Sequence, residues 1–296
     1  MTILRIKGYF RKSSLAVMKK MTIKFASNVA EGTYIETQAG PIFTRTFGHG
    51  KPLIIIHGGP GLEHSYLVKW LAPLADKRQL IFYDQCGCGH DKTPISRVSA
   101  SLMVDQLMFL IESLHLNSDV GFFSHSWGDY IVLSLLERYN SVHVREAIFA
   151  NPMGLTADRF EESGQRLMTR VPEQIMTKLE ELSSQEDIEP ASAIMDLLLP
   201  YYVGSSASVP DVEFFSYSNP VYEKVVESLG SFDVRDQCSY LPEKTLVVYG
   251  SEDFETPDGS PELQRPSTKV HIIPEVGHFS FAEAPDIFLK TVSDFL

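Results

Sequence analysis

Short apolar runs separated by longer mixed segments set the pattern of this chain from Tyr34 onward. Five runs rich in aliphatic and aromatic residues predict strands at 53–56, 80–83, 120–123, 146–150 and 245–249, and 269–273 predicts a last one. Such runs are typical of strands buried on both faces of a mostly parallel sheet. Residues 42–46 (IFTRT) alternate apolar and polar side chains, which predicts a solvent-facing edge strand.

Apolar residues at helical spacing occupy the segments between these strands. Residues 100–115 carry one apolar stripe, the residues after Gly128 repeat at the same spacing, and a final amphipathic helix follows Pro285. Strands that alternate with helices predict right-handed crossovers and a doubly wound α/β sheet.

The alternation stops between residues 153 and 240. Helices are predicted there at 157–170, 172–185, 190–199 and 220–229, with Pro172, Pro190 and Pro220 placed where first-turn prolines are tolerated. A block of helices inserted between two strands predicts a lid over one end of the sheet. We therefore expect a core of residues 31–152 and 241–296 and a helical cap of residues 153–240.

Composition and charge narrow the class of protein. The chain has 296 residues, of which 44% are hydrophobic and 22% charged, as in ordinary soluble globular proteins. No apolar run approaches the roughly 20 residues of a membrane helix, so we expect no stable membrane insertion. The net charge of -12 argues against nucleic-acid binding, which needs a basic face. Residues 1–30 are basic and contain no acidic residue, and we expect a loosely ordered arm there.

The three cysteines are Cys86, Cys88 and Cys238. An odd and sparse set does not indicate a disulfide framework and suits a cytoplasmic protein. CGCGH (86–90) has no second cluster that could complete a zinc site, so we predict a glycine-rich turn and no metal.

One serine, Ser126, follows the predicted strand at 120–123 and has a small residue two places away on each side, in the segment GFFSHSWGDY (121–130). Ser126 has Ser124 two places before it and Gly128 two places after it. A nucleophilic serine needs a tight strand-to-helix turn that presents its oxygen, and this turn requires small neighbours. Ser124 would have Phe122 and Ser126 at those places, a poorer fit. We predict that Ser126 is a nucleophile; a buried or helix-capping serine is the alternative.

HGGPG (57–61) directly follows the predicted strand at 53–56. Acyl transfer develops negative charge on an oxygen, and backbone N–H groups aimed at that oxygen stabilise it. Glycines allow the backbone to approach the substrate closely. We predict an oxyanion hole formed by the N–H groups of Gly59 and Trp127.

An acid and a base follow the last two predicted strands. Asp253 lies in VYGSEDFETP and His278 in EVGHFSFAEAP, so the order along the chain is Ser126, Asp253, His278, as in α/β-hydrolases. His278 would take the serine proton, and Asp253 would orient the imidazole. The rival acids are Glu252, Glu255 and Asp258, and the rival base is His271.

HGGPG (57–61), YDQCGCG (83–89), SHSWG (124–128), GSEDFETP (250–257) and VGH (276–278) together resemble the proline iminopeptidase family of α/β-hydrolases. The resemblance covers about residues 33–296. It implies the α/β-hydrolase fold with an inserted helical cap, and a cytoplasmic serine hydrolase that needs no metal or organic cofactor.

Three features depart from the family. Cys86 stands where DQRG-type turns carry a basic residue, and Asp129 stands where the elbow carries a small one. Family members bind the free amine of the substrate through cap glutamates, and the family stretch rich in Gly, Pro and Glu is shortened here. Glu223 and Glu227, after NPVY (219–222), are the remaining candidates for that role.

These observations predict a serine hydrolase that cleaves a small amide or ester through an acyl-enzyme. Release of an N-terminal proline or small apolar residue from a short peptide is the most specific version. An esterase, lactonase or thioesterase acting on a small molecule is the alternative, because the lid sets that choice. A third hypothesis is a hydrolase-fold protein that binds a ligand without turnover.

Overall fold

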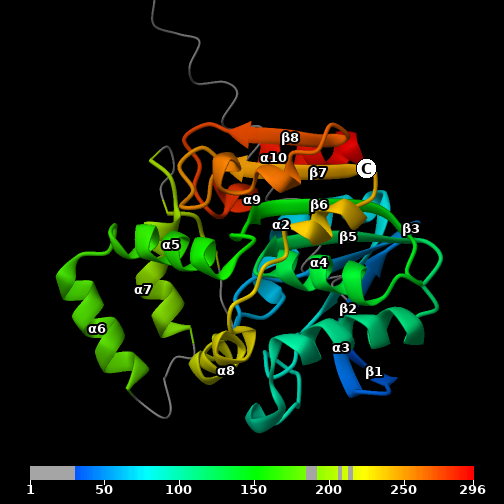
Figure 1. The fold of residues 1–296 in the computed structure, drawn as a ribbon, viewed down its shortest axis with the longest axis horizontal. Helices are drawn as coiled ribbons and strands as arrows, with labels where there is room; N and C mark the ends of the chain where they lie inside the picture. Colours follow the sequence, from blue (N-terminus) through cyan, green and yellow to red (C-terminus); the bar gives the residue numbers. More distant parts are fainter. Residues whose placement is uncertain (1–30, 185–191, 206–208, 213–215) are drawn as a thin grey trace, which may run out of the picture. The chain divides into compact units, whose positions relative to one another are not determined.

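A computed structural model describes residues 31–184, 192–205, 209–212 and 216–296, and the predicted arm of residues 1–30 lies outside them. One eight-stranded sheet forms the centre of the fold (Figure 1). Its strands are β1 (Thr33–Thr37), β2 (Gly40–Gly48), β3 (Lys51–Ile56), β4 (Arg78–Tyr83), β5 (Val120–Ser126), β6 (Val144–Pro152), β7 (Thr245–Gly250) and β8 (Thr268–Ile273). All six strands predicted from apolar runs are present.

The strand order is β1-β2-β4-β3-β5-β6-β7-β8. The pairs from β4 to β8 are parallel, whereas β2 pairs antiparallel with both β1 and β4. The prediction that residues 42–46 form an edge strand is therefore wrong, because β1 covers the outer side of β2. Alternation of apolar and polar residues does not fix the position of a strand in the sheet. In β2 the consecutive residues Ile42, Phe43 and Thr44 are all buried, so the predicted alternation of exposure is absent there.

Helices pack on the sheet and connect its strands. The α-helices are α2 (Ser65–Leu71), α3 (Ala100–Ser113), α4 (Gly128–Arg138), α5 (Ala157–Met168), α6 (Glu173–Ser183), α7 (Ala193–Tyr202), α8 (Asn219–Leu229), α9 (Ser280–Glu283) and α10 (Pro285–Phe295). The short 3₁₀ helices are η1 (Ala72–Asp76), η2 (Ile95–Arg97), η3 (Asp236–Tyr240), η4 (Pro257–Gly259) and η5 (Pro261–Leu263). Ser99 caps α3 by accepting a hydrogen bond from the backbone N–H of Leu102 at 3.1 Å.

The apolar stripes of α3 and α4 are buried in the same hydrophobic cluster as the inward side chains of β3, β4 and β5. Side chains such as Ile54, Phe122, Leu107 and Ile131 are fully buried in it. This burial explains why the apolar patterns of the sequence predicted the strands and helices of the core so closely. None of the helices in the described residues has both the length and the apolar character to cross a bilayer.

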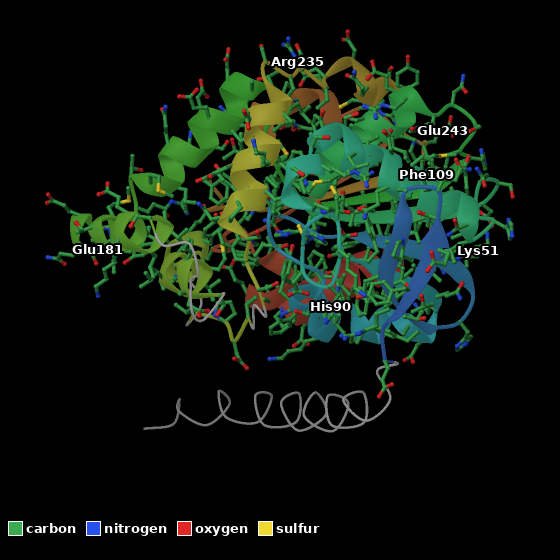
Figure 2. All side chains as sticks on the ribbon, turned by 90° about the horizontal axis from the view of Figure 1, so that it is seen from below. Lys51, His90, Phe109, Glu181, Arg235 and Glu243 are labelled. Carbon is green, nitrogen blue, oxygen red and sulfur yellow. The ribbon has the colours of Figure 1, made fainter. Side chains whose placement is uncertain are left out.

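The four helices α5 to α8 lie between β6 and β7 in the chain, as predicted. Figure 1 shows them together beside the carboxyl ends of the parallel strands. Figure 2 shows Glu181 of α6 on the opposite side from Lys51 and Glu243, which stand at or near the amino ends of β3 and β7. Helix α7 begins later than predicted and continues through Pro200, while Pro190 lies outside the described residues. The division into core and cap stays a prediction.

Candidate active site

Ser126 is the last residue of β5 and directly precedes Trp127, where the chain turns into α4. Its φ is +52°, a left-handed conformation that few residues other than glycine adopt. A Cβ on Gly128 would lie 2.8 Å from the carbonyl oxygen of Ile56, so strand and helix crowd together as the sequence analysis expected. Backbone and neighbours thus give Ser126 the strained strand-to-helix turn that the sequence analysis expected at this position.

His278 follows β8 and lies against Asp253, which follows β7. Its Nδ1 is 2.9 and 3.0 Å from the two carboxylate oxygens of Asp253, and both side chains are buried. The backbone N–H of Phe254 also donates to Asp253, at 2.7 Å. His278 and Ser126 line one cavity, and within the described part of the chain no hydrogen bond joins them. Catalytic contacts of this kind are often long before substrate binds.

Asn151, at the end of β6, holds the acid and base loops together, and no motif in the sequence marked it. Its amide nitrogen donates to Asp253 Oδ2 and to the carbonyl of Gly277, both at 2.9 Å, and its Oδ1 accepts from Ser280. Its φ is +50°, which asparagine tolerates better than most residues. The available signal was an asparagine directly after the apolar run at 146–150.

The predicted oxyanion loop and the nucleophile turn are linked by buried polar groups. Gly59 has φ +126° and lines the cavity beside Ser126, whereas the side chain of Trp127 is fully buried. The indole N–H of Trp127 donates to Gln85, and Gln85 Nε2 donates to the carbonyl of His57 at 2.7 Å. One side chain from a third loop, Gln85, therefore joins the indole of Trp127 to the backbone two residues before Gly59.

The rival acids and the rival base lie elsewhere. Glu252 accepts hydrogen bonds from Ser205. Glu255 is buried and pairs with Arg159. Asp258 is exposed, and His271 lies within β8 beside a different cavity. Of the six acid and base candidates, Asp253 and His278 are the acid and the base in mutual contact.

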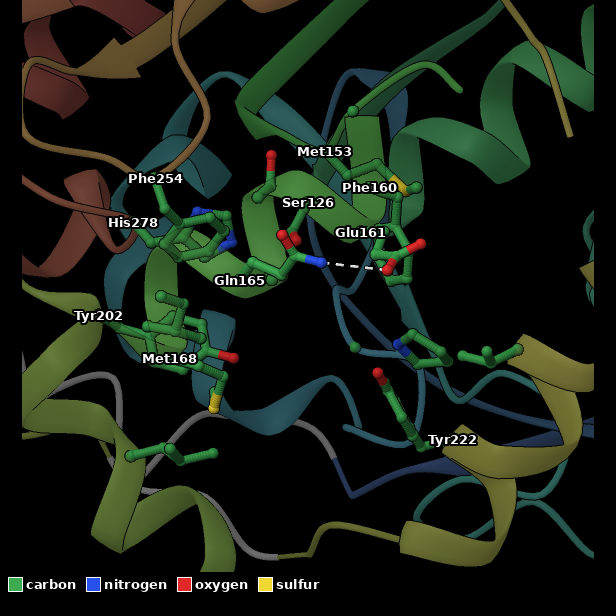
Figure 3. Close-up of a pocket in the computed structure, with 18 of the residues that line it drawn as sticks. Ser126, Met153, Phe160, Glu161, Gln165, Met168, Tyr202, Tyr222, Phe254 and His278 are labelled. Carbon is green, nitrogen blue, oxygen red and sulfur yellow. Dashed lines mark hydrogen bonds between the residues drawn. The ribbon is translucent and has the colours of Figure 1, made fainter. Parts of the chain in front are cut away.

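A cavity of about 1010 Å³ opens next to Ser126 and His278, between the sheet and the helices α5, α7 and α8. Figure 3 shows Ser126, His278 and Glu161 around it. Most of its wall is apolar or aromatic and includes Met153, Phe160, Leu167, Met168, Met195, Leu198, Tyr202, Tyr217, Tyr222, Val226, Leu229, Phe232, Phe254 and Phe279. Among the described residues that line it, Glu161 of α5 carries the one carboxylate, and this carboxylate accepts from Gln165 at 3.1 Å.

Glu223 and Glu227 do not line this cavity. Glu223 is exposed and accepts from Asn219, and Glu227 is exposed and pairs with Lys224 at 2.7 Å. Their neighbours Tyr222 and Val226 face the cavity instead. Each residue of a helix is rotated by about 100° from the one before it, so this one-residue offset turns both carboxylates away.

The inserted helices contact the loops that carry the site. The backbone N–H of His278 donates to the carbonyl of Tyr202, at the end of α7, at 2.8 Å. The N–H of Ser218, before α8, donates to the carbonyl of Gly61 at 2.8 Å. Arg170 donates to the carbonyl of Glu252 at 2.9 Å. A shift of these helices would therefore move the base loop and the loop of Gly59.

Two of the three departures from the resembling family, Asp129 and Cys86, are buried. Asp129 is fully buried in the first turn of α4 and accepts a hydrogen bond from Ser124 at 2.5 Å. Burial raises its pKa well above the ordinary value, which favours the neutral acid. Burial also raises the pKa of the Cys86 thiol to about 12, so this cysteine is an inert apolar residue.

One group of described residues could supply ligands to a metal ion. Glu63, His64 and Asp84 each place one ligand atom within 4.8 Å of the others, and all three are buried. Asp84 already accepts hydrogen bonds from His64 and His90. Although burial opposes ionisation, the hydrogen bond from His64 holds the pKa of Asp84 well below its usual range. Protein donors thus satisfy this carboxylate without an ion.

Comparison with known proteins agrees with this geometry. The family model described as the alpha/beta hydrolase fold matches residues 51–285. A proline iminopeptidase of Heyndrickxia coagulans is 27% identical over 285 residues, which cover 89% of this chain and 97% of that protein. The resemblance to proline iminopeptidases predicted from the motifs is confirmed.

Solved structures agree in fold. An alpha/beta fold family hydrolase from Bacillus anthracis str. Sterne matches with a TM-score of 0.71 at 19% identity, over 90% of this chain and 99% of that one. The proline iminopeptidase of Mycobacterium smegmatis matches with a TM-score of 0.64 at 20% identity, over 90% and 97%. The predicted fold class is confirmed, and the chain belongs to the α/β-hydrolase fold family.

Proposed function

We propose that this protein is a serine hydrolase that cleaves a small amide or ester through an acyl-enzyme on Ser126. The observation that carries the proposal is the left-handed Ser126 at a strand-to-helix turn, in one cavity with a histidine paired to a buried aspartate. This is the arrangement that acyl transfer by serine requires.

In this proposal His278 Nε2 accepts the Ser126 proton as the serine oxygen attacks the substrate carbonyl. Asp253 accepts a hydrogen bond from His278 Nδ1, fixes the tautomer and stabilises the imidazolium that forms. The N–H groups of Gly59 and Trp127 stabilise the oxyanion. His278 then protonates the leaving group, and water releases the acyl group from Ser126.

The substrate version that follows from the resemblance is a short peptide with an N-terminal proline or small apolar residue. The apolar wall of the cavity would hold that side chain. Glu161 would receive the amine, because its carboxylate lines the same cavity and Glu223 and Glu227 do not. We further propose that the helices of residues 153–240 act as the cap that sets this choice.

A second candidate is an esterase, lactonase or thioesterase for a larger apolar molecule. The size and apolar wall of the cavity favour it, since about 1010 Å³ exceeds the volume of one proline residue. For either activity we propose a cytoplasmic site of action, because all three cysteines are unpaired and buried.

A fluorophosphonate probe tests the reaction class without knowledge of the substrate. The wild type should be labelled on Ser126, and Ser126→Ala should not be labelled. Ser124→Ala, which changes the rival serine in the same segment, should still be labelled. Folded wild-type protein that resists the probe would favour the binding protein without turnover.

A panel of aminoacyl amides and simple aryl esters then separates the two substrate classes. An aminopeptidase should prefer a free amine on the substrate and slow strongly when the amine is acylated. If rates on blocked and free substrates agree, the aminopeptidase version is wrong and the esterase version stands.

A further inference from the structure

Three buried hydrogen bonds run between the loops that carry the proposed catalytic groups. The backbone N–H of Gly58 donates to the hydroxyl oxygen of Tyr66 at 2.7 Å. That hydroxyl lies 2.7 Å from Nδ1 of His125, and Nε2 of His125 lies 3.0 Å from the carbonyl oxygen of His278. We propose that this Tyr66–His125 relay fixes Gly59, Ser126 and His278 relative to one another, with Tyr66 and His125 as positioning residues. The inference rests on the proposed function.

The relay connects three loops that the hydrogen bonds of the sheet do not join. Gly58 precedes Gly59 in the loop after β3, and His125 precedes Ser126 at the end of β5. His278 lies in the loop after β8, which is three strands from β5 in the sheet. Sheet hydrogen bonds between β3 and β5 end at Ile56 and Ser124, so they do not reach these loops.

The direction of each hydrogen bond follows from its chemistry. A backbone N–H can only donate, so the oxygen of Tyr66 accepts from Gly58. A carbonyl can only accept, so the proton of His125 is on Nε2, facing His278. His125 Nδ1 is then unprotonated and accepts the hydroxyl proton of Tyr66. All three bonds are satisfied by one tautomer of His125.

Burial keeps the relay in this neutral form. Tyr66 and His125 are 2% and 1% exposed. Burial, with the nearby His278, lowers the pKa of His125 well below its ordinary value. Burial also raises the pKa of Tyr66. Because both ring nitrogens are engaged, His125 is not a second base, although it lies beside the cavity.

The side chains of the relay are tightly packed against their neighbours. The ring of His125 contacts those of His278, Phe279 and Phe281, with centroids 5.0, 5.5 and 5.1 Å apart. A Cβ on Gly58 would lie 2.8 Å from His125 Nδ1 and 2.9 Å from the Tyr66 hydroxyl. Gly58 must therefore be glycine for the loop to reach the relay. Loss of one link leaves room for small shifts, and shifts near 1 Å are costly in catalysis.

Tyr66→Phe tests the relay because it keeps the ring and removes the hydroxyl that takes part in two of the three bonds. The matched control is Tyr83→Phe, at another buried tyrosine whose hydroxyl has no hydrogen-bond partner among the described residues. We expect the rate of fluorophosphonate labelling of Ser126 to fall about 10- to 100-fold in Tyr66→Phe and to be unchanged in Tyr83→Phe. Equal rates in these two variants would overturn the relay.

Nitrogen-15 NMR of histidine in the wild type gives a readout that needs no activity. His125 should show a protonated Nε2 and an unprotonated Nδ1 that persist from about pH 5 to 8. A proton on Nδ1, or titration in this range, would overturn the relay even if Tyr66→Phe failed to fold. If the wild type shows the expected tautomer but resists the probe, the proposed function fails and the relay stands as structure.

Discussion

The indole N–H of Trp127 donates a 2.9 Å hydrogen bond to Oε1 of Gln85. Gln85 also donates to the carbonyl of His57, so one buried amide joins the nucleophile turn to the loop of Gly59. Gln85→Met keeps a similar volume and loses both bonds. The free energy of unfolding should fall by about 1–3 kcal/mol, because buried polar groups lose their partners. Urea unfolding and the fluorophosphonate labelling rate, which should also fall, measure the two effects.

Gln106→Met is the control for this change. Gln106 is buried on α3, donates to Asp91 at 2.9 Å and does not line the cavity. In Gln106→Met the free energy of unfolding should fall by about 1 kcal/mol, and the labelling rate of Ser126 should equal that of the wild type. If both glutamine variants label at the wild-type rate, Gln85 has no part in positioning the site.

Asp253→Asn should lower kcat by about 10⁴-fold, because an amide cannot hold His278 in the required tautomer. The matched variant is Asp258→Asn, which changes an exposed aspartate on the same loop and should leave kcat unchanged. Steady-state rates on any ester that the wild type hydrolyses suffice. A similar loss in both variants would point to a general disturbance of this loop.

Glu161→Gln tests recognition of a substrate amine. Removing the charge should raise KM for aminoacyl substrates by about tenfold, with kcat little changed, because an ion pair in the bound state is lost. Hydrolysis of esters without an amine should not respond. Glu162→Gln is the control, since Glu162 pairs with Arg159 and Arg166 outside the cavity. An equal response on both substrate classes would contradict amine binding by Glu161.

Asp129→Asn should stabilise the protein increasingly as pH rises. The folded-state pKa of Asp129 lies above the unfolded value, close to 3.8, so its contribution to stability is complete below that pH. This contribution is lost as pH rises through the folded pKa. In that window the wild type should lose about 1.4 kcal/mol per pH unit relative to the variant.

Urea unfolding at several pH values measures this difference. Asp286→Asn serves for comparison, because Asp286 is an exposed acid in the first turn of α10. Asp286→Asn should lower the free energy of unfolding by about 0.3–1 kcal/mol at neutral pH, because a carboxylate in the first turn interacts favourably with the helix dipole. This change has the opposite sign to that expected for Asp129→Asn. A constant difference between Asp129→Asn and the wild type from pH 4 to 8 (roughly the range of carboxyl titration in proteins) would contradict a raised pKa.

Gly128→Ala should lower both stability and the labelling rate of Ser126. The added Cβ would lie 2.8 Å from the carbonyl oxygen of Ile56, so strand and helix must separate. We expect a loss of about 1–3 kcal/mol. Gly164→Ala, also within a helix, places its Cβ in open space and should stabilise α5 by about 0.5–1 kcal/mol. Thermal or urea unfolding should show that Gly128→Ala is less stable and Gly164→Ala more stable than the wild type.

Local patterns in the sequence were sufficient for the core of the fold. Runs such as LIII and VGFF are buried strands, and the segments after them carry Gly59, Ser126, Asp253 and His278. Parallel strands place their carboxyl ends at one edge of the sheet, so residues that follow different strands were expected to lie near each other. The contact between His278 and Asp253 agrees with that expectation.

Other features required pairing between distant segments. Nothing local to residues 42–46 revealed that β1 would cover them, because alternation does not fix the position of a strand in the sheet. Glu161 and Glu223 are both acids on helices of the insertion, and the rotation of each helix decided that Glu161 faces the cavity.

Gln85, Asn151 and the Tyr66–His125 relay are likewise products of tertiary structure. Each is a polar side chain without a distinctive spacing in the sequence, and each finds its partner only when separate loops meet. The sequence by itself determined which segments become strands and which residue types follow them, because burial periodicity and turn chemistry act over a few residues. Only the tertiary structure decided which side chains meet, because a hydrogen bond depends on ångström-scale distances between segments far apart in the chain.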